Sequence, residues 1–104
     1  MPKDIKMRVG FIQTKPLFGK VAENTQNAVR KLKEVNADII VLPELFNTGY
    51  NFKTIKEIAP LAETINGKTV AALQEVAKKK DMCIVAGIAE KYGKNIYNSS
   101  AMIT

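Results

Sequence analysis

Glu44 is the residue of this sequence whose type and position most clearly suggest chemistry. It follows the apolar run at residues 37–43, within the stretch VLPELFNTGY. A continuous apolar run closed by a proline is typical of a strand buried on both faces, and α/β proteins gather functional groups at the carboxyl ends of such strands. Leu45 and Phe46 come next, so we expect partial desolvation to raise the pKa of this carboxylate and suit it to general-base catalysis. A carboxylate here could equally cap a turn or pair with a lysine.

The residues after Glu44 predict a turn that presents aromatic side chains. Asn47, Thr48 and Gly49 favour a turn, which would bring Tyr50 and Phe52 to the same sheet edge. Tyr50 is therefore a candidate wall of a small-molecule pocket. For Phe52 we expect packing beneath the loop instead.

Several kinds of catalytic and metal site are excluded within this sequence. It contains no histidine and one cysteine, Cys83, which excludes Cys/His zinc sites, serine-histidine triads and an internal disulfide. Cys83 lies in the apolar run at residues 82–89 with no turn behind it, which favours a buried, inert thiol. Lys91 and Lys94 occupy a polar hairpin, where solvated lysines are expected. No metal or cofactor is predicted.

Composition predicts a globular protein of a single domain, residues 1–104. The formal charge is +6, and 46% of the residues are hydrophobic. The basic residues cluster at 30–33 and 78–80, in expected last turns of helices, where they complement the helix dipole, so we predict no nucleic-acid partner. No apolar run has the length of a signal peptide or a membrane span, which favours a cytoplasmic protein with no membrane partner.

Hydrophobic periodicity predicts an α/β fold with a mixed sheet. Apolar residues alternate at Ile5, Met7, Val9 and Phe11, as in a strand with one face buried. A helix is expected from Val21 to Val35, followed by a strand at 37–43. A short helix from Thr54, with Glu57 in a capping box, precedes a long helix from Thr69 to Lys80. The last elements are strands at 82–90 and 96–104, joined by a turn at 91–95. Two crossovers and a terminal hairpin make the sheet mixed.

The ordered set VLPELFNTGY, IVAGIAE and YNS resembles the N-terminal part of the nitrilase superfamily of carbon-nitrogen hydrolases. The likeness runs from about Ile5 to the end of the sequence. It implies the N-terminal half of an αββα sandwich with helices on one face of a mixed sheet, and hence a partial carbon-nitrogen hydrolase domain. It further implies hydrolysis of small amide, nitrile or N-carbamyl substrates without a cofactor.

The resemblance also assigns roles to residues. In the family pattern a glutamate acts as base, a lysine stabilises the tetrahedral intermediate and a cysteine attacks the substrate carbon. Glu44 matches the base, Tyr50 resembles a pocket residue, and Glu90 matches an acidic position near the active-site lysine. Asn98 is expected to hold strands together rather than contact substrate.

The matching lysine and cysteine fall beyond Thr104 in the family pattern, so we expect this chain alone to be inactive. An apolar sheet face without its second layer predicts a homo-oligomer or pairing with a complementary chain. The alternative hypothesis is a truncated, non-catalytic homologue that serves as an association module.

Overall fold

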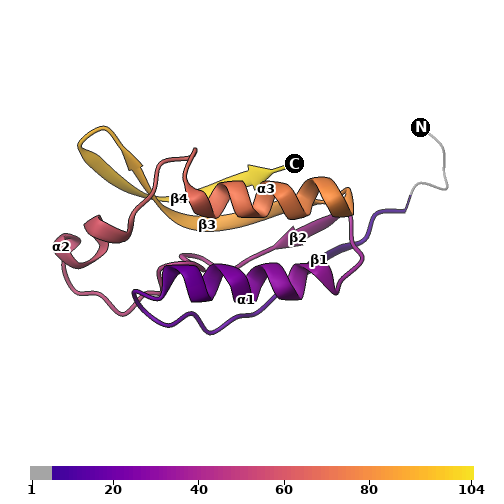
Figure 1. Ribbon diagram of the computed structural model, residues 1–104, viewed down its shortest axis with the longest axis horizontal. Helices are drawn as coiled ribbons and strands as arrows, with labels where there is room; N and C mark the ends of the chain where they lie inside the picture. The colour runs from indigo at the N-terminus through magenta and orange to yellow at the C-terminus, as the bar shows by residue number, and fades with distance from the viewer. Residues whose placement is uncertain (1–5) are drawn as a thin grey trace.

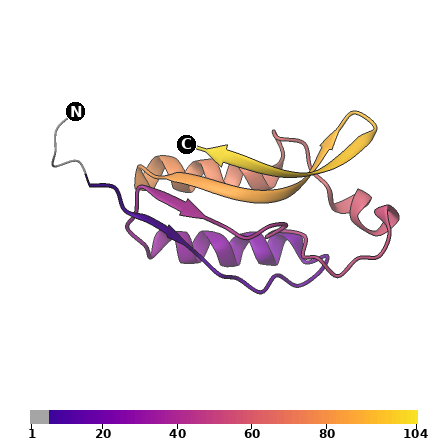
Figure 2. The same ribbon diagram turned by 180° about the vertical axis from the view of Figure 1, so that it is seen from behind.

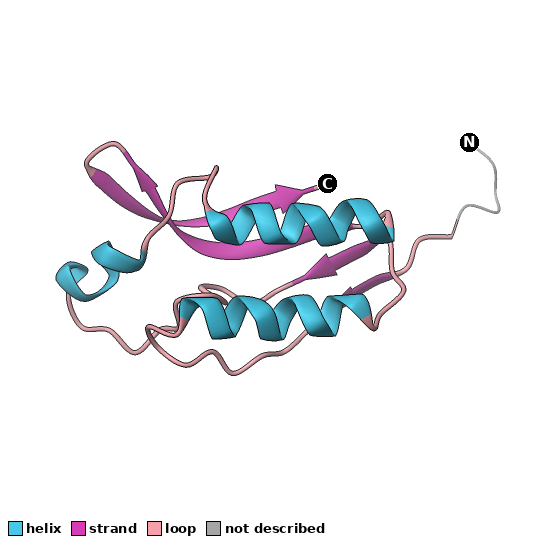
Figure 3. Cartoon of the chain, viewed as in Figure 1, coloured by secondary structure: helices cyan, strands magenta, loops and turns pink. Residues whose placement is uncertain are grey.

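The computed structural model describes residues 6–104, which form a four-stranded mixed sheet with two long helices on one face (Figures 1 and 3). The elements are β1 (Val9–Phe11), α1 (Val21–Lys33), β2 (Ile39–Val41), α2 (Ile55–Ile58), the 3₁₀ turn η1 (Ala59–Leu61), α3 (Lys68–Lys80), β3 (Cys83–Tyr92) and β4 (Asn95–Ile103). The strand order is β1-β2-β3-β4, with β1, β2 and β3 parallel and β4 antiparallel to β3.

The connections explain why both long helices lie on one face. Crossovers between parallel strands are right-handed, and here each one steps to the next strand in the same direction. Successive helices are therefore placed on the same side of the sheet, where α1 and α3 pack against each other. The predicted α/β fold, with a mixed sheet and helices on one face, is confirmed.

The main core lies between these helices and the sheet. Leu32 of α1, Leu73 of α3 and Ile84 of β3 are fully buried in it. Val70, Val76 and Ala77 are also buried, as the helical spacing predicts. A smaller cluster of Leu45, Ile58 and Ala89 lies apart from this core, on the side of the pocket described below.

No helix covers the opposite face of the sheet within residues 6–104 (Figure 2). The strand register aligns Phe11, Val41, Val85 and Met102 across the sheet. Phe11 is 75% exposed and Met102 is 73% exposed. We call the face that carries these four residues the open face. Large apolar side chains rarely form so continuous an exposed patch unless another surface covers it.

Two expectations about burial are wrong because the open face has no covering layer within residues 6–104. The strand at 37–43 was expected to be buried on both faces, but only its helix side is, since Ile40 is buried and Val41 is exposed. In β1 the alternating apolar residues lie on the open face, so Val9 is 63% exposed. Alternation correctly marks a face suited to burial, yet burial needs a partner surface.

The predicted helix positions agree closely with the structure, whereas β1 begins only at Val9, after Met7, and β2 covers Ile39–Val41 of the predicted 37–43. Helix α1 begins at Val21 as expected and ends at Lys33, and α3 extends one residue further toward its N-terminus than predicted. The hairpin turns at Gly93, whose φ is +60°. Ile5, expected in the first strand, lies outside the described residues.

We expect the chain to self-associate through the open face. Burying a large apolar side chain contributes about 1.5–3 kcal/mol of free energy. Replacing both Phe11 and Met102 with glutamine removes this contribution, so the dissociation constant for self-association should rise roughly tenfold or more. Light scattering across a dilution series measures this. Tyr92→Gln, at a side chain that is 72% exposed on the hairpin but outside this face, is the control. A monomeric wild-type chain at high concentration would contradict the expectation.

Candidate functional site

The loop that follows β2 runs along β3 and approaches it most closely at Gly87. The amide of Leu42 donates to the carbonyl of Val85 at 2.8 Å, and that of Phe46 donates to the carbonyl of Gly87 at 3.1 Å. A Cβ on Gly87 would lie 2.6 Å from the Cα of Glu44, closer than real Cβ contacts occur. The missing side chain therefore allows the loop to lie against β3 here, and this close approach positions Glu44.

A left-handed residue follows directly. Leu45 has φ +50°, a conformation that costs an L-residue roughly 1–2 kcal/mol. Its side chain is only 6% exposed and packs in the small cluster with Ile58 and Ala89. Packing thus holds a strained residue next to a carboxylate, and such strain concentrates at functional sites.

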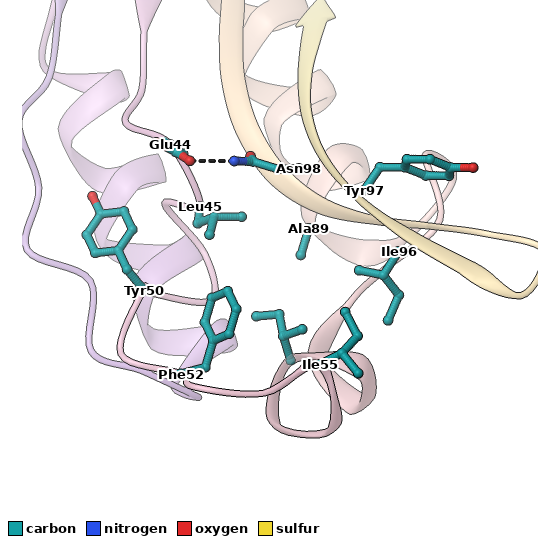
Figure 4. A pocket seen from close by; sticks show the side chains of 10 residues that line it. Glu44, Leu45, Tyr50, Phe52, Ile55, Ala89, Ile96, Tyr97 and Asn98 are labelled. Atoms are coloured by element: carbon teal, nitrogen blue, oxygen red, sulfur yellow. Dashed lines mark hydrogen bonds between the residues drawn. The ribbon is translucent and has the colours of Figure 1, made fainter.

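Asn98 of β4 holds the carboxylate of Glu44. Its Nδ2 donates a hydrogen bond to Oε1 of Glu44, and Figure 4 shows the two side chains pointing toward each other. Asn98 pairs with Ala89 in the register, so it lies on the open face. Asn98 therefore links β4 to the loop after β2, and the same hydrogen bond orients Glu44.

A hollow of about 440 Å³ opens beside this pair, as Figure 4 shows. We call it the apolar pocket. Its polar end is Glu44 with Asn98, and Tyr50 and Tyr97 lie at its rim. The body is lined by apolar side chains from the loop, α2 and the hairpin: Leu45, Phe52, Ile55, Ile58, Ala89 and Ile96. A second hollow of about 390 Å³, lined by Val85, Gly87 and Ser100 among others, lies on the other side of Glu44. The carboxylate therefore borders two concavities.

Glu44 and Tyr50 both line the apolar pocket, and their roles toward a substrate stay predictions. The expected desolvation of Glu44 is wrong. Its side chain is exposed rather than partly desolvated. The reason is the same as for Val41, since the open face is uncovered within the described residues. Phe52 lines the pocket and also packs beneath the loop, with its ring 6.0 Å from that of Phe18.

Glu90 does not line the apolar pocket, and its expected place in a substrate pocket near an active-site lysine stays a prediction. It follows Ala89 in β3, and successive strand residues point to opposite faces. Its carboxylate accepts a 2.8 Å hydrogen bond from the hydroxyl of Ser99. Glu90 thus lies on the helix side of the sheet, while Glu44 lies on the open side.

A polar network behind the loop was not predicted. The backbone N–H and the hydroxyl of Thr69 donate to Glu63 at 2.9 and 2.6 Å, and Nδ2 of Asn47 donates to Oγ1 of Thr69 at 3.1 Å. Asn24 of α1 donates to the carbonyl of Asn47 at 2.8 Å. The network ties the loop to both long helices. The one signal in the sequence was Asn24, a polar residue one helical turn before the buried Ala28.

Glu63 also has a backbone role in shaping the pocket. Its N–H donates to the carbonyl of Ala89 at 3.1 Å, and its carbonyl accepts from the N–H of Lys91 at 2.8 Å. The segment thereby occupies the edge of β3 that β2 leaves free beyond Val41, next to the hairpin that forms one wall.

Cys83 is half-buried rather than buried, and it lies at the far end of β3 from the site. Gly87 lies four positions further along the strand, a distance of roughly 13 Å at the usual rise of a strand. Lys91 and Lys94 are exposed, as expected for a polar hairpin. None of these side chains lines the apolar pocket.

Helix α2 forms one wall of the pocket and begins with the predicted capping box. The carboxylate of Glu57 accepts hydrogen bonds from the backbone N–H groups of Lys53 at 2.7 Å and Thr54 at 2.9 Å. These bonds, that to Lys53 first, hold the pKa of Glu57 below its ordinary value of 4.5.

Neither a membrane span nor a metal cluster is found in the described part of the chain. None of the helices within residues 6–104 has the length and apolarity to cross a bilayer. The same residues contain no group of three or more Cys, Asp or Glu side chains placed to hold a metal ion.

Comparison with known proteins shows which family this chain matches. Residues 7–104 match the sequence profile of the family described as carbon-nitrogen hydrolase. A nitrilase of Pyrococcus abyssi is 39% identical over 101 residues, covering 93% of this chain and 38% of the relative. A 2-oxoglutaramate amidase of Bacillus subtilis is 32% identical, with 91% of this chain and 37% of the relative covered.

A solved structure shows the same fold. The crystal structure of an N-terminal amidase superposes with a TM-score of 0.83 at 25% identity, covering 94% of this chain and 25% of that one. The chain thus spans less than two fifths of the length of each of these relatives.

We expect Gly87→Ala to destabilise the protein by about 1–3 kcal/mol, because its Cβ would press on backbone atoms of the loop. Chemical denaturation followed by circular dichroism measures the free energy of unfolding. Gly10→Ala is the matched control, since its Cβ would meet only a side-chain atom of Ile40 at 3.4 Å. Equal effects of the two substitutions would contradict the close approach of the loop at Gly87.

We expect the cap of α2 to weaken in acid. The pKa of Glu57 is lowered in the folded state. The stabilisation that its carboxylate gives to the start of α2 is therefore complete above the unfolded pKa of 4.5, and it is lost as the pH falls through the folded pKa. The amide shifts of Lys53 and Thr54, followed by NMR, should therefore titrate with a midpoint below 4.5. Glu57→Gln should abolish this titration. A midpoint at or above 4.5 would count against the capping box.

Proposed function

Because the chain belongs to the carbon-nitrogen hydrolase family, we propose that Glu44 is the general base in the hydrolysis of a non-peptide carbon-nitrogen bond. The observation that carries the proposal is the position of its carboxylate, oriented by Asn98 at the polar end of a pocket. The substrates we propose are small amides, nitriles or N-carbamyl compounds. The amidase and nitrilase names of the relatives support this class.

The geometry around Glu44 suits a base. Asn98 engages Oε1, and no other hydrogen bond to this carboxylate is found among residues 6–104. The amide holds the group in one orientation while Oε2 can accept a proton. The strained backbone at Leu45 and the close approach to Gly87 keep the carboxylate against the sheet rather than free in a loop.

The proposed reaction needs a nucleophile and a cation that other residues supply. Glu44 removes the proton of a cysteine thiol, and the thiolate attacks the carbon of the scissile bond. An amide then gives a thioester and a nitrile a thioimidate, while a lysine stabilises the anionic intermediate. In amide hydrolysis the protonated Glu44 returns its proton to the leaving amine.

Among residues 6–104 no lysine or cysteine lines the pocket beside Glu44. Cys83 is on the order of 13 Å along β3 from Gly87, given the rise of a strand, too far to exchange a proton with Glu44. We therefore propose that the lysine and cysteine come from residues outside this sequence, and that the 104-residue chain alone is inactive.

A second candidate function is an association module without catalysis. The open face favours it, since Phe11 and Met102 together expose a broad apolar surface. The strained and supported position of Glu44 favours the enzyme, because association would not require an oriented carboxylate.

We expect Glu44→Gln to lower kcat by about 10²–10⁴, the usual contribution of a general base, with little change in KM. The test is a chimera in which this chain replaces the matching segment of the Pyrococcus abyssi nitrilase, which is 39% identical. Initial rates on an amide, a nitrile and an N-carbamyl acid measure the effect. The isolated chain should show no turnover.

Glu75→Gln is the matched control, since Glu75 pairs with Lys79 on an exposed helix face far from the loop. It should leave the chimera unaffected. An active chimera that tolerates Glu44→Gln would refute the proposed base, and turnover by the isolated chain would refute the need for outside residues.

A further inference from the structure

The apolar pocket has a chemical asymmetry that bears on its substrate. We propose that it accepts the acyl side of a small amide or nitrile that is uncharged and branched or aromatic, and that it discriminates against a substrate with a carboxylate there. This inference rests on the proposed function, because Glu44 must act at the polar end of the pocket.

The two ends of the pocket differ in chemistry. Glu44 and Asn98 face each other at one end, and Figure 4 shows Leu45, Ala89 and Ile96 pointing into the space beyond them. A scissile carbon-nitrogen group that meets the carboxylate therefore extends its remaining atoms among apolar side chains. Hydrocarbon atoms gain by leaving water there, whereas a charged group loses its hydration.

The floor of the pocket is a packed apolar surface rather than a chance exposure. Leu45, Ile58 and Ala89 are 6%, 2% and 3% exposed and form one cluster. They come from the loop, α2 and β3, so the surface depends on the tertiary fold. The volume of about 440 Å³ is near the lower part of the range of roughly 300–1,000 Å³ for small-molecule sites, which fits a compact substrate.

The charges of the residues that line the pocket also favour an uncharged substrate. The described lining residues include one carboxylate, Glu44, and no lysine or arginine. Lys91 lies opposite Ile96 in the hairpin register, but its side chain is exposed and does not line the pocket. A substrate carboxylate would therefore enter without a cation to pair with and close to a like charge, which is unfavourable.

The test compares two amides of the same shape. In 4-methylpentanamide an isopropyl group occupies the position of the carboxylate in succinamate. Both are titrated into the ¹⁵N-labelled chain, and amide shifts are followed by NMR. We expect the apolar amide to bind at least roughly tenfold more tightly, a modest value for apolar-pocket discrimination. The perturbed amides should be those of Leu45, Ala89 and Ile96.

A charge introduced into the wall should change the preference. Ile96→Arg places a cation in the pocket, so succinamate should gain affinity and 4-methylpentanamide should lose it. The matched control is Tyr92→Arg, on the same hairpin at a side chain 72% exposed and outside the lining. It adds the same net charge and should leave the preference of the wild-type chain unchanged.

Three outcomes would overturn the inference. They are equal or tighter binding of succinamate to the wild-type chain, no perturbation of the pocket by the apolar amide, and shifts confined to the open face around Phe11 and Met102. Failure of the proposed function is separate. An inactive chimera with a pocket that still prefers 4-methylpentanamide would remove the reaction and leave the binding preference standing.

Discussion

The close approach of the loop to Gly87 is the constraint on which the rest of the site depends. A backbone can lie this close to a strand only where the strand presents no side chain. This approach holds Glu44 beside β3, and Asn98 of β4, which lies on the other side of β3, holds the carboxylate. The loop after β2 and the hairpin of β3 and β4, about fifty residues apart in sequence, thereby place one acid. Leu45, next to the close approach, has a left-handed backbone.

The two faces of the sheet carry separate tasks. The helix face holds the main core, in which Leu32, Leu73 and Ile84 are fully buried, and it accounts for most of the stability. The open face carries Glu44, the apolar pocket and a band of exposed apolar side chains. Membership of the carbon-nitrogen hydrolase family fits this division, since the chain spans only part of the length of its relatives. An acid that is exposed in this chain therefore occupies a face whose composition is suited to being covered.

The pocket and its support illustrate how polar and apolar contacts cooperate. Asn47, Thr69 and Glu63 tie the loop to α3 through buried hydrogen bonds, which have a specific geometry. Leu45 and Ile58 supply packing, which is less directional but stabilises the same segment. The first set determines where the loop lies, and the second gives the pocket its apolar floor. A substrate preference thus arises from residues whose immediate role is to hold the backbone.

The sequence by itself determined the order of the elements, the helix boundaries within a few residues and Glu44 as the candidate acid, because local periodicity and turn chemistry depend on neighbouring residues. Only the tertiary structure decided which faces are buried, that Glu90 points away from the pocket while Asn98 reaches Glu44, and that Ile55 and Ile96 face the same hollow. These relations join segments separated by tens of residues. Strand register and the path of a loop set them, and neither leaves a periodic signal along the chain.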